Sequence, residues 1–322
     1  MNNNNETDQR IMRIIKKITL AALLIMGALL SKGQQDPMYT QYIFNLQTVN
    51  PAYVGSWQTI GITALTREQW IGFQGHPSTQ SFSLQTPLKS ENVGIGLNVI
   101  LDKVGLEKRL TLNFDYSYKI LLSEMTSLRF GIKGGFTNYS NNLTAYTQYP
   151  DNQSDPMYQT NIENKFMPNF GFGLYLSSEK YYLSLSLPRI IEGNYQINAN
   201  NAYTTTSEIR HIYFAGGMVF NLTDQIKFKP NFMTQTVTGA PFQYDLSANF
   251  LFAEKFWIGG MYRSGDALGA IAQWIFNKNL RFGYAYDFTT TDLQNFHNGI
   301  HEVMVSYEFT YSKRKYVSPR YF

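Results

Sequence analysis

Apolar and polar residues alternate along most of this chain. In the stretch from Thr111 to Ile120, one set of alternate positions is apolar or aromatic and the other holds Thr, Asn, Asp, Ser and Lys. A period of two is typical of a β-strand, because successive side chains of a strand point to opposite faces. Similar alternation recurs in stretches whose apolar faces begin at Val93, Leu128, Tyr244, Leu280 and Val303. The pattern predicts an all-β protein.

The length of these stretches separates two kinds of β protein. Strands of soluble sandwiches run for about five or six residues and turn a charged face to water. Here the alternation continues for roughly ten residues, which is enough to cross a bilayer at a tilt. The polar faces are rich in Gly, Ser, Asn and Thr, with isolated charges. The pattern therefore favours a transmembrane antiparallel β-barrel.

The spacing of the strands indicates their number and orientation. Starting from a first strand near Trp57–Trp70, every second junction is tight, and the long junctions, residues 141–163, 188–207 and 289–299, all belong to the other set. Outer-membrane barrels alternate short periplasmic turns with longer outer loops. We therefore expect about fourteen strands with both ends in the periplasm, or about twelve or sixteen if one hairpin is miscounted.

Aromatic residues near the ends of the predicted strands suggest interfacial girdles. Amphipathic rings favour the headgroup zone of a membrane. The candidates, for which ordinary strand packing is the alternative, are Trp57, Trp70, Trp257 and Tyr262.

The N-terminus has the pattern of a secretory signal. Four basic residues between Arg10 and Lys17 precede an apolar run, residues 18–30, that ends at Ser31-Lys32-Gly33. This run is short for a helix that spans a bilayer, so we favour a signal peptide over a membrane anchor. Met12 is an alternative start to Met1. The predicted divisions are a signal peptide, residues 1–33; a plug-like segment, residues 34–56; a barrel, residues 57–311; and a basic periplasmic tail, residues 312–322.

Composition removes several classes of function. The chain has no cysteine and four histidines, and its net charge is only +4, with no basic block of the kind that binds nucleic acid. Mean hydropathy is -0.27, too polar for a bundle of membrane helices but compatible with a barrel. Motifs of nucleophilic, phosphate-binding or metal sites are not found. We expect no catalytic residue, cofactor or metal. An outer-membrane hydrolase is the least favoured of the functions considered.

Charged residues on the polar faces carry both signs. Charges inside a barrel need water or a partner. We expect lumenal ion pairs that stiffen the barrel, in preference to a row that conducts a substrate. The predicted lumenal charges are Arg67, Asp102, Arg129, Lys133, Asp245, Arg263, Asp266, Arg281 and Asp287.

The stretch after the signal peptide is unlike the rest of the chain. It is too irregular and too broken by proline for a barrel strand, and too aromatic for a disordered tail. We expect it to tuck into the lumen as a plug or to contact a partner. Its candidate contact residues are Asp36, Pro37, Tyr39, Gln41, Tyr42, Asn45, Asn50 and Pro51.

The same stretch carries a family resemblance. "QDPMYTQYIFN…NPAYVG" is similar to the N-terminal signature of the PorP/SprF family, outer-membrane components of the type IX secretion system of Bacteroidetes. Further similar strings follow in order along the chain: "REQWIGFQGHPSTQSFSLQTPL", "GIGLNVILDKVG", "GAPFQYDL", "FWIGGMYRSGDALG", "GYAYDFT", "GIHEVMVSYEF" and "SPRYF". Leu46, where proline is expected, and Ile300, where serine is expected, depart from the family pattern.

The resemblance implies a noncatalytic role. Such a protein would lie in the outer membrane, in contact with lipid, and support secretion and surface attachment of cargo such as gliding or adhesion proteins. Its partners would be cargo C-terminal domains and other secretion components. Residues 141–163 and 188–207 would be candidates for cargo contact, and the tail Lys313–Arg320 for periplasmic contact; solvated loops and a solvated tail are the alternatives. The alternative function is a channel for small or hydrophobic solutes on a similar barrel.

Overall fold

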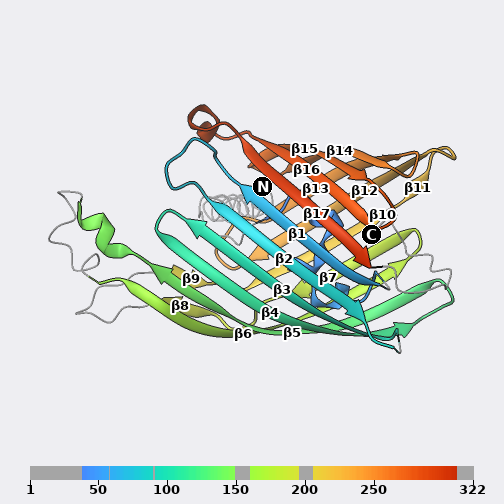
Figure 1. The fold of residues 1–322 in the computed structure, drawn as a ribbon, viewed down its shortest axis with the longest axis horizontal. Coiled ribbons are helices and arrows are strands. Elements are labelled where there is room, and N and C mark those ends of the chain that lie inside the picture. Colours follow the sequence, from blue (N-terminus) through green and yellow to red (C-terminus); the bar gives the residue numbers. More distant parts are fainter. Residues whose placement is uncertain (1–37, 58, 90, 149–159, 196–205, 310–322) are drawn as a thin grey trace, which may run out of the picture.

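A computed structural model describes residues 38–57, 59–89, 91–148, 160–195 and 206–309. Within these residues, strands β1 to β17, apart from β8 and β9, form one antiparallel sheet. Strands that are consecutive along the chain lie next to each other in this sheet. The sheet closes on itself in two ways. The first and last strands pair from Ile60 opposite Phe309 to Glu68 opposite His301, and β10 pairs with both β7 and β12. Figure 1 shows the resulting barrel of tilted strands.

The wall contains fourteen strands, since β11 continues β10 along the same neighbour, β12, after an interruption at Val219. The predicted fold and strand number are therefore confirmed. The wall elements are β1 (Ile60–Glu68), β2 (Ser78–Pro87), β3 (Val93–Val104), β4 (Glu107–Leu121), β5 (Thr126–Asn141), β6 (Ile162–Ser178), β7 (Tyr181–Leu187), β10 (His211–Met218), β11 (Phe220–Asn221), β12 (Ile226–Val237), β13 (Gln243–Phe252), β14 (Phe256–Arg263), β15 (Ala267–Ile275), β16 (Leu280–Thr289) and β17 (Ile300–Phe309).

The two ends of the barrel differ in their connections. At one end, here called the short-turn end, tight junctions join β2 to β3, β4 to β5, β6 to β7, β11 to β12, β13 to β14 and β15 to β16. The opposite end, the long-loop end, carries residues 142–161, 188–210 and 290–299. Short elements in these loops are the 3₁₀ helices η4 (Leu143–Gln148) and η7 (Asp292–Phe296) and the paired strands β8 (Gly193–Tyr195) and β9 (Thr206–Glu208).

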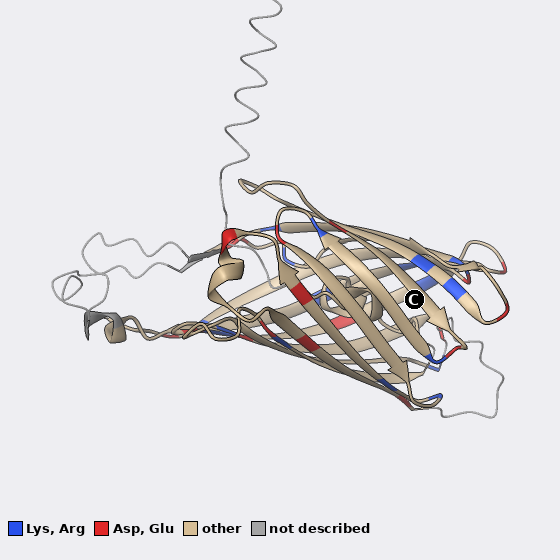
Figure 2. Ribbon diagram, turned by 90° about the horizontal axis from the view of Figure 1, so that it is seen from above, with Lys and Arg blue, Asp and Glu red and all other residues tan. Residues whose placement is uncertain are grey.

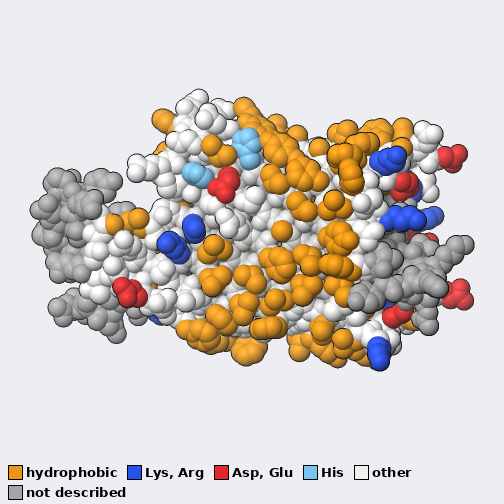
Figure 3. Space-filling view, viewed as in Figure 1, with side chains coloured by type: hydrophobic (Ala, Val, Ile, Leu, Met, Phe, Trp, Pro, Cys, Tyr) orange, Lys and Arg blue, Asp and Glu red, His pale blue; other side chains and the backbone are white. Residues whose placement is uncertain are grey.

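Side chains on the outer surface are largely apolar. Phe114, Ile132 and Ile258 expose 60%, 62% and 55% of their surface, and each lies on the outward set of alternate positions. On the face seen in Figure 3, hydrophobic side chains form a band across the middle of the barrel, and the charged side chains lie mainly towards its two ends. Charged residues also occur along the wall strands, as the coloured ribbon of Figure 2 shows. A closed sheet satisfies its backbone hydrogen bonds internally, so such a band can face lipid. Among the described residues, no helix is both long enough and apolar enough to cross a membrane.

The expected aromatic girdle is wrong for two of its four members. Trp57 and Trp257 are 4% and 2% exposed, because they lie inside the barrel instead of on its outer face. Tyr262 does face outward, with 42% exposed, and Trp70 is half-buried in a long-loop-end turn. A large aromatic ring can be buried in the lumen or placed at the membrane interface, and both environments stabilise it. Its position in the sequence does not distinguish between the two.

Candidate functional site

The residues from Met38 to Trp57, here called the lumenal segment, lie inside the barrel. In Figure 1 this segment is the blue chain enclosed by the wall strands. It forms three short 3₁₀ helices, η1 (Tyr42–Phe44), η2 (Leu46–Thr48) and η3 (Pro51–Tyr53). Its apolar side chains share one buried cluster with inward-facing residues of seven wall strands, among them Tyr175, Tyr182, Tyr213, Met233, Met261, Ile271 and Ala285. The barrel therefore has a core, and this segment provides much of it.

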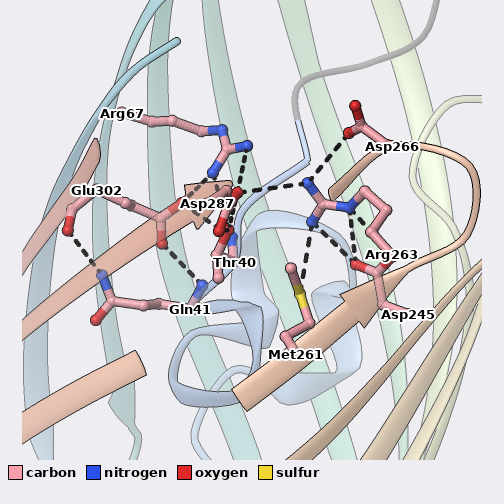
Figure 4. A network of polar contacts seen from close by, with 9 residues as sticks. All are labelled: Thr40, Gln41, Arg67, Asp245, Met261, Arg263, Asp266, Asp287 and Glu302. Atoms are coloured by element: carbon pink, nitrogen blue, oxygen red, sulfur yellow. Dashed lines mark hydrogen bonds and ion pairs between the residues drawn. The ribbon is translucent and has the colours of Figure 1, made fainter. Parts of the chain in front are cut away.

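At the long-loop end, the start of the lumenal segment is held by a buried carboxylate. The backbone N–H groups of Thr40 and Gln41 donate to the two oxygens of Glu302, at 2.9 and 2.8 Å. The Thr40 hydroxyl contacts both oxygens of Asp287, at 2.8 and 2.6 Å. Arg67 joins these groups, since one of its nitrogens donates to Glu302 and the Thr40 hydroxyl and the other to Asp287. Figure 4 shows this arrangement.

The network continues on the neighbouring strands. Arg263 donates to both oxygens of Asp245, with its shortest contact at 2.9 Å, and its Nη1 lies 3.9 Å from both Asp266 and Asp287. Asp287 therefore lies between two arginines. Arg67, Arg263, Asp245 and Asp287 are all at most 2% exposed, and only Asp266 is more open, at 39%. Buried ions of this kind persist only where partners and hydrogen bonds compensate them.

The middle of the lumenal segment crosses to the opposite wall. The Gln47 amide donates to the carbonyls of Leu84 and Leu97 and to the carboxylate of Asp115, at 3.1 to 3.2 Å. Lys133 donates to the carbonyls of Gln47 and Thr48 and lies 3.7 Å from Asp115. The predicted charge Lys133 thus binds both the segment and Asp115, which lies on the polar face of the 111–120 strand and was not among the predicted lumenal charges.

Asn50, in the turn before η3, both caps this short helix and binds the barrel wall. Its side-chain oxygen accepts from the backbone N–H of Ala52, which caps the short helix, and Pro51 occupies the first helical position. Its amide nitrogen donates to the carbonyl of Leu174 and to the hydroxyl of Ser184, at 2.9 and 2.7 Å. The sequence Asn-Pro therefore specifies the local turn and also its attachment to β6 and β7.

The short-turn end holds the segment mainly by its backbone. Gly55 donates its N–H to Gln85 and accepts from Arg129 at its carbonyl, at 3.0 and 2.8 Å. Ser117 donates to the carbonyl of Val54 at 2.6 Å. Trp57 donates to the Tyr53 hydroxyl at 2.8 Å, and burial raises the pKa of Tyr53 to about 12, so that hydroxyl remains a neutral acceptor.

Glycines on the inner wall let the segment approach closely. A Cβ added to Gly131 would lie 2.1 Å from the backbone nitrogen of Ala52, and one added to Gly94 would lie 2.4 Å from the carbonyl oxygen of Val54. A Cβ added to Gly173 would lie 2.0 Å from the side-chain oxygen of Asn50. No side chain fits at such distances. The wall is therefore shaped for this segment at positions where any other residue would push it away.

Six of the eight residues predicted to act as plug contacts lie within the described part of the chain. Tyr39, Gln41, Tyr42, Asn45, Asn50 and Pro51 are all buried in the barrel. Asn45 donates to Ser83, and Tyr42 packs in the apolar cluster. Asp36 and Pro37 lie outside the described residues.

The predicted lumenal charges fall into two groups. Seven of them, Arg67, Arg129, Lys133, Asp245, Arg263, Asp266 and Asp287, take part in the contacts above. The other two make different contacts: Asp102 accepts from Thr79 at 2.6 Å, and Arg281 pairs with Glu308 and lies over the ring of Trp57, the last residue of the lumenal segment. Ion pairs are formed by Arg67, Lys133, Asp245, Arg263, Asp266, Arg281 and Asp287.

Sequence reasoning missed several residues that hold the segment. Glu302, on the polar face of the last strand, is absent from the predicted lumenal charges, although it binds Thr40, Gln41 and Arg67. Register would have revealed it, since Glu302 lies opposite Arg67 where β1 meets β17. Lys229 is a further residue that holds the segment, since its ammonium donates to the Ile43 carbonyl and faces the rings of Phe44 and Trp257. The contacts of Gly94, Gly131 and Gly173 with the segment could not be predicted from the sequence, which shows only that these glycines lie on polar faces.

A small cavity of about 50 Å³ lies at the long-loop end. Its floor includes Thr48 and Val49 of the lumenal segment. Three charged residues also line it: Asp102 of β3, Arg109 of β4 and Arg189, which follows the end of β7. Within the described part of the chain, no group of three or more His, Cys, Asp or Glu residues is placed to hold a metal ion. The chemistry of the site is hydrogen bonding and ion pairing.

Comparison with solved structures finds barrels of low similarity. The CymD monoaromatic hydrocarbon channel has a TM-score of 0.49 at 12% identity, covering 87% of this chain and 95% of that chain. Omp33 of Acinetobacter baumannii scores 0.45 at 7% identity, covering 79% and 100%. A FadL homologue of Pseudomonas aeruginosa scores 0.44 at 10% identity, covering 87% and 96%. Each TM-score is below 0.5, so none bears on what this barrel binds or conducts.

Comparison with protein families is decisive, whereas no curated protein matches the sequence. The family model described as type IX secretion system membrane protein PorP/SprF matches residues 31–307. That range includes the whole lumenal segment and nearly all of the wall. The resemblance read from the sequence strings is confirmed, and this chain belongs to the PorP/SprF family of type IX secretion system membrane proteins.

Proposed function

We propose that this protein is a noncatalytic docking component of the type IX secretion system in the outer membrane, with its lumen closed by the lumenal segment. In this role it supports secretion and surface attachment of particular cargo proteins, such as gliding or adhesion proteins. Family membership supports the secretion role. The observation that carries the docking role is the attachment of the lumenal segment to the wall from Thr40 to Gly55.

A closed lumen argues against the alternative, a solute channel. An open channel needs a continuous aqueous path, and this lumen contains an apolar cluster made jointly by the segment and the wall. Three residues that the segment contributes to that cluster, Tyr42, Ile43 and Leu46, are at most 2% exposed. Such packing is close to that of a protein interior and leaves little room for a diffusing solute.

The surfaces left for partners are the two ends of the barrel and its lipid-facing band. We propose the long-loop end for cargo C-terminal domains, with the ranges 141–163 and 188–207 as contacts, although parts of both ranges lie outside the described residues. Other secretion components would meet the short-turn end and the basic tail, which also lies outside them. We also propose that residues 1–33 are a signal peptide that directs export of the protein.

The proposed function is tested in two experiments. Deleting the gene and comparing the surface proteins of mutant and parent cells should show loss of a small set of secreted proteins, restored by the intact gene. An unchanged surface proteome would reject the secretion role. In planar bilayers the purified protein should give little current; sustained open-channel current would instead favour the channel.

A further inference from the structure

Two lysines face outward from the wall near the long-loop end. Lys103 of β3 and Lys108 of β4 lie directly opposite each other, and both side chains are exposed. All other Lys and Arg residues within the described wall strands occupy inward positions. On the face seen in Figure 3, basic side chains lie together at the long-loop border of the hydrophobic band. This pair is therefore an exception in a wall that otherwise turns its cations inward.

The charges of the two lysines are not compensated by the described part of the chain. Within that part, neither ammonium group has a hydrogen bond or an ion pair. The neighbouring acids, Asp102 and Glu107, belong to the inward set of positions. Asp102 accepts from Thr79, and Glu107 pairs with Arg109. Like charges directly opposite each other on one face of a sheet are destabilising, so an anion held between the lysines would stabilise this hairpin.

The positions beside the pair leave room for such an anion. Ser78 and Ser140, both small, lie opposite the two lysines on the neighbouring strands β2 and β5. Glu68, the next carboxylate along this row on the side of β1, accepts from the Ser78 hydroxyl at 2.8 Å and lies 3.6 Å from His76. That carboxylate is thus already held by other groups, one strand beyond the serine.

The lysine pair lies at the border of the lipid-facing band. Next to it on the same outward columns, Leu101 lies opposite Leu110, which is 42% exposed. Both columns remain apolar or aromatic as far as Val93 opposite Tyr118. At about 3.3 Å per residue and a tilt of about 40°, the distance from Val93 to Lys103 corresponds to about 25 Å across the membrane, the usual height of an apolar band. The ammonium groups therefore lie at the level of lipid headgroups.

We propose that Lys103 and Lys108 bind a phosphate group of a lipid in the outer leaflet of the outer membrane. The long loops of such barrels face the outside, and the lipids of that leaflet carry phosphorylated sugar headgroups. Each ammonium group donates to phosphate oxygens, whose negative charge offsets the repulsion between the lysines. The acyl chains of the same lipid contact the apolar columns of β3 and β4. The inference depends on the location in the outer membrane and not on the secretion role.

Binding of lipid A, a phosphorylated glycolipid, to the purified protein tests this site. The protein in an uncharged detergent is titrated with lipid A or with the same lipid after its phosphates are removed, and bound lipid is measured by native mass spectrometry. The test variant combines Lys103→Gln with Lys108→Gln. The control combines Lys255→Gln with Lys278→Gln, which remove the same charge from exposed turns at the short-turn end. A heat-dependent shift in gel migration shows that each variant has folded.

We expect the test variant to bind lipid A about thirty-fold more weakly than the parent, because each lysine at an anionic lipid surface contributes about five-fold. The control should bind as the parent does. Unchanged binding in the test variant, an equal loss in the control, or equal binding of the lipid without phosphates would overturn the proposal. An excess of inorganic phosphate should leave the lipid bound; displacement would assign the pair to free phosphate instead of lipid.

The stability of a single variant provides an independent measurement. In detergent without lipid, Lys103→Gln should be at least as stable to urea as the parent, because it removes one of two opposed charges. Added lipid A should stabilise the parent more than Lys103→Gln. Lower stability of Lys103→Gln without lipid would show that the lysines stabilise the wall by themselves, and the proposal would then fail. Neither measurement involves cargo secretion, so failure here is distinct from failure of the proposed function.

Discussion

The two ends of the lumenal segment are attached to the wall by different interactions. At the long-loop end, Thr40 and Gln41 bind ionised groups on side chains, chiefly Glu302 and Asp287. At the short-turn end, Val54 and Gly55 lie against glycines and bind mostly through their backbone. The first attachment depends on the charged side chains of Glu302, Asp287 and Arg67. The second depends on shape and persists as long as the wall does.

The largest effect is expected when the charged end is broken. Glu302→Ala removes the acceptor of two backbone N–H groups and leaves Arg67 without one of its buried partners. Loss of one partner from a buried ion pair costs about 3–5 kcal/mol. Urea unfolding in detergent measures this loss. Hydrogen exchange should show faster exchange at Thr40 and Gln41 and unchanged protection at Gly55.

A matched control uses the same strand pair. Glu68→Ala removes a carboxylate from the outward face of β1, where Glu68 lies opposite His301 and is about a third exposed. Exposed pairs contribute only about 0–1 kcal/mol. If both variants lost the same stability, or if Glu302→Ala loosened Gly55 as much as Thr40, the two ends would not be independent.

Breaking the packed end should have the next largest effect. Gly131→Leu forces a side chain into the backbone of Ala52, and overpacking of this kind costs about 1–3 kcal/mol or displaces the segment. We expect lower stability together with new current in planar bilayers. Gly134→Leu is the control on the same strand, because the nearest atom to an added Cβ there is the Phe170 side chain at 3.7 Å. Equal behaviour of the two variants would contradict a wall shaped for the segment.

Asn50 tests the part of the segment between the two ends. Asn50→Ala removes the cap of η3 and the donor to Leu174 and Ser184. A lost cap and an unsatisfied buried group together cost about 2 kcal/mol. Asn50→Asp restores the acceptor for Ala52 but not the donor, so it should recover only part of that stability in urea unfolding. Full recovery would mean that the bonds to the wall contribute nothing.

The smallest effect is expected from the hydroxyl of Tyr53, and only at high pH. Its pKa is raised by burial from 10.0 to about 12, so the folded state favours the neutral phenol. Stability from this preference is fully present below pH 10 and is lost as the pH rises towards 12. Urea unfolding at several pH values should show this decline in the parent protein and a weaker one in Tyr53→Phe. The same slope in both would assign the decline to other groups.

The sequence by itself determined the barrel. Alternation of period two, strands of bilayer length and the parity of short and long junctions gave the fold and the strand number, because each is a local property of the chain. Local signals also identified the segment before β1 as different from the wall, since proline and glycine exclude a regular strand there. The family followed from ordered strings of residues, and it too needed no coordinates.

Tertiary structure decided where the segment lies and what holds it. Glu302 and Thr40 are 262 residues apart, and nothing local marks them as partners. Trp57 and Trp257 resemble interfacial aromatics in the sequence but pack in the lumen, because an alternating pattern shows that two faces differ without showing which rings the interior accepts. Gly131 and Gly134 are alike in sequence, and only the closed wall reveals that one faces the segment and the other faces outward. These contacts form across a closed sheet, so they depend on register and curvature that no single stretch of the chain contains.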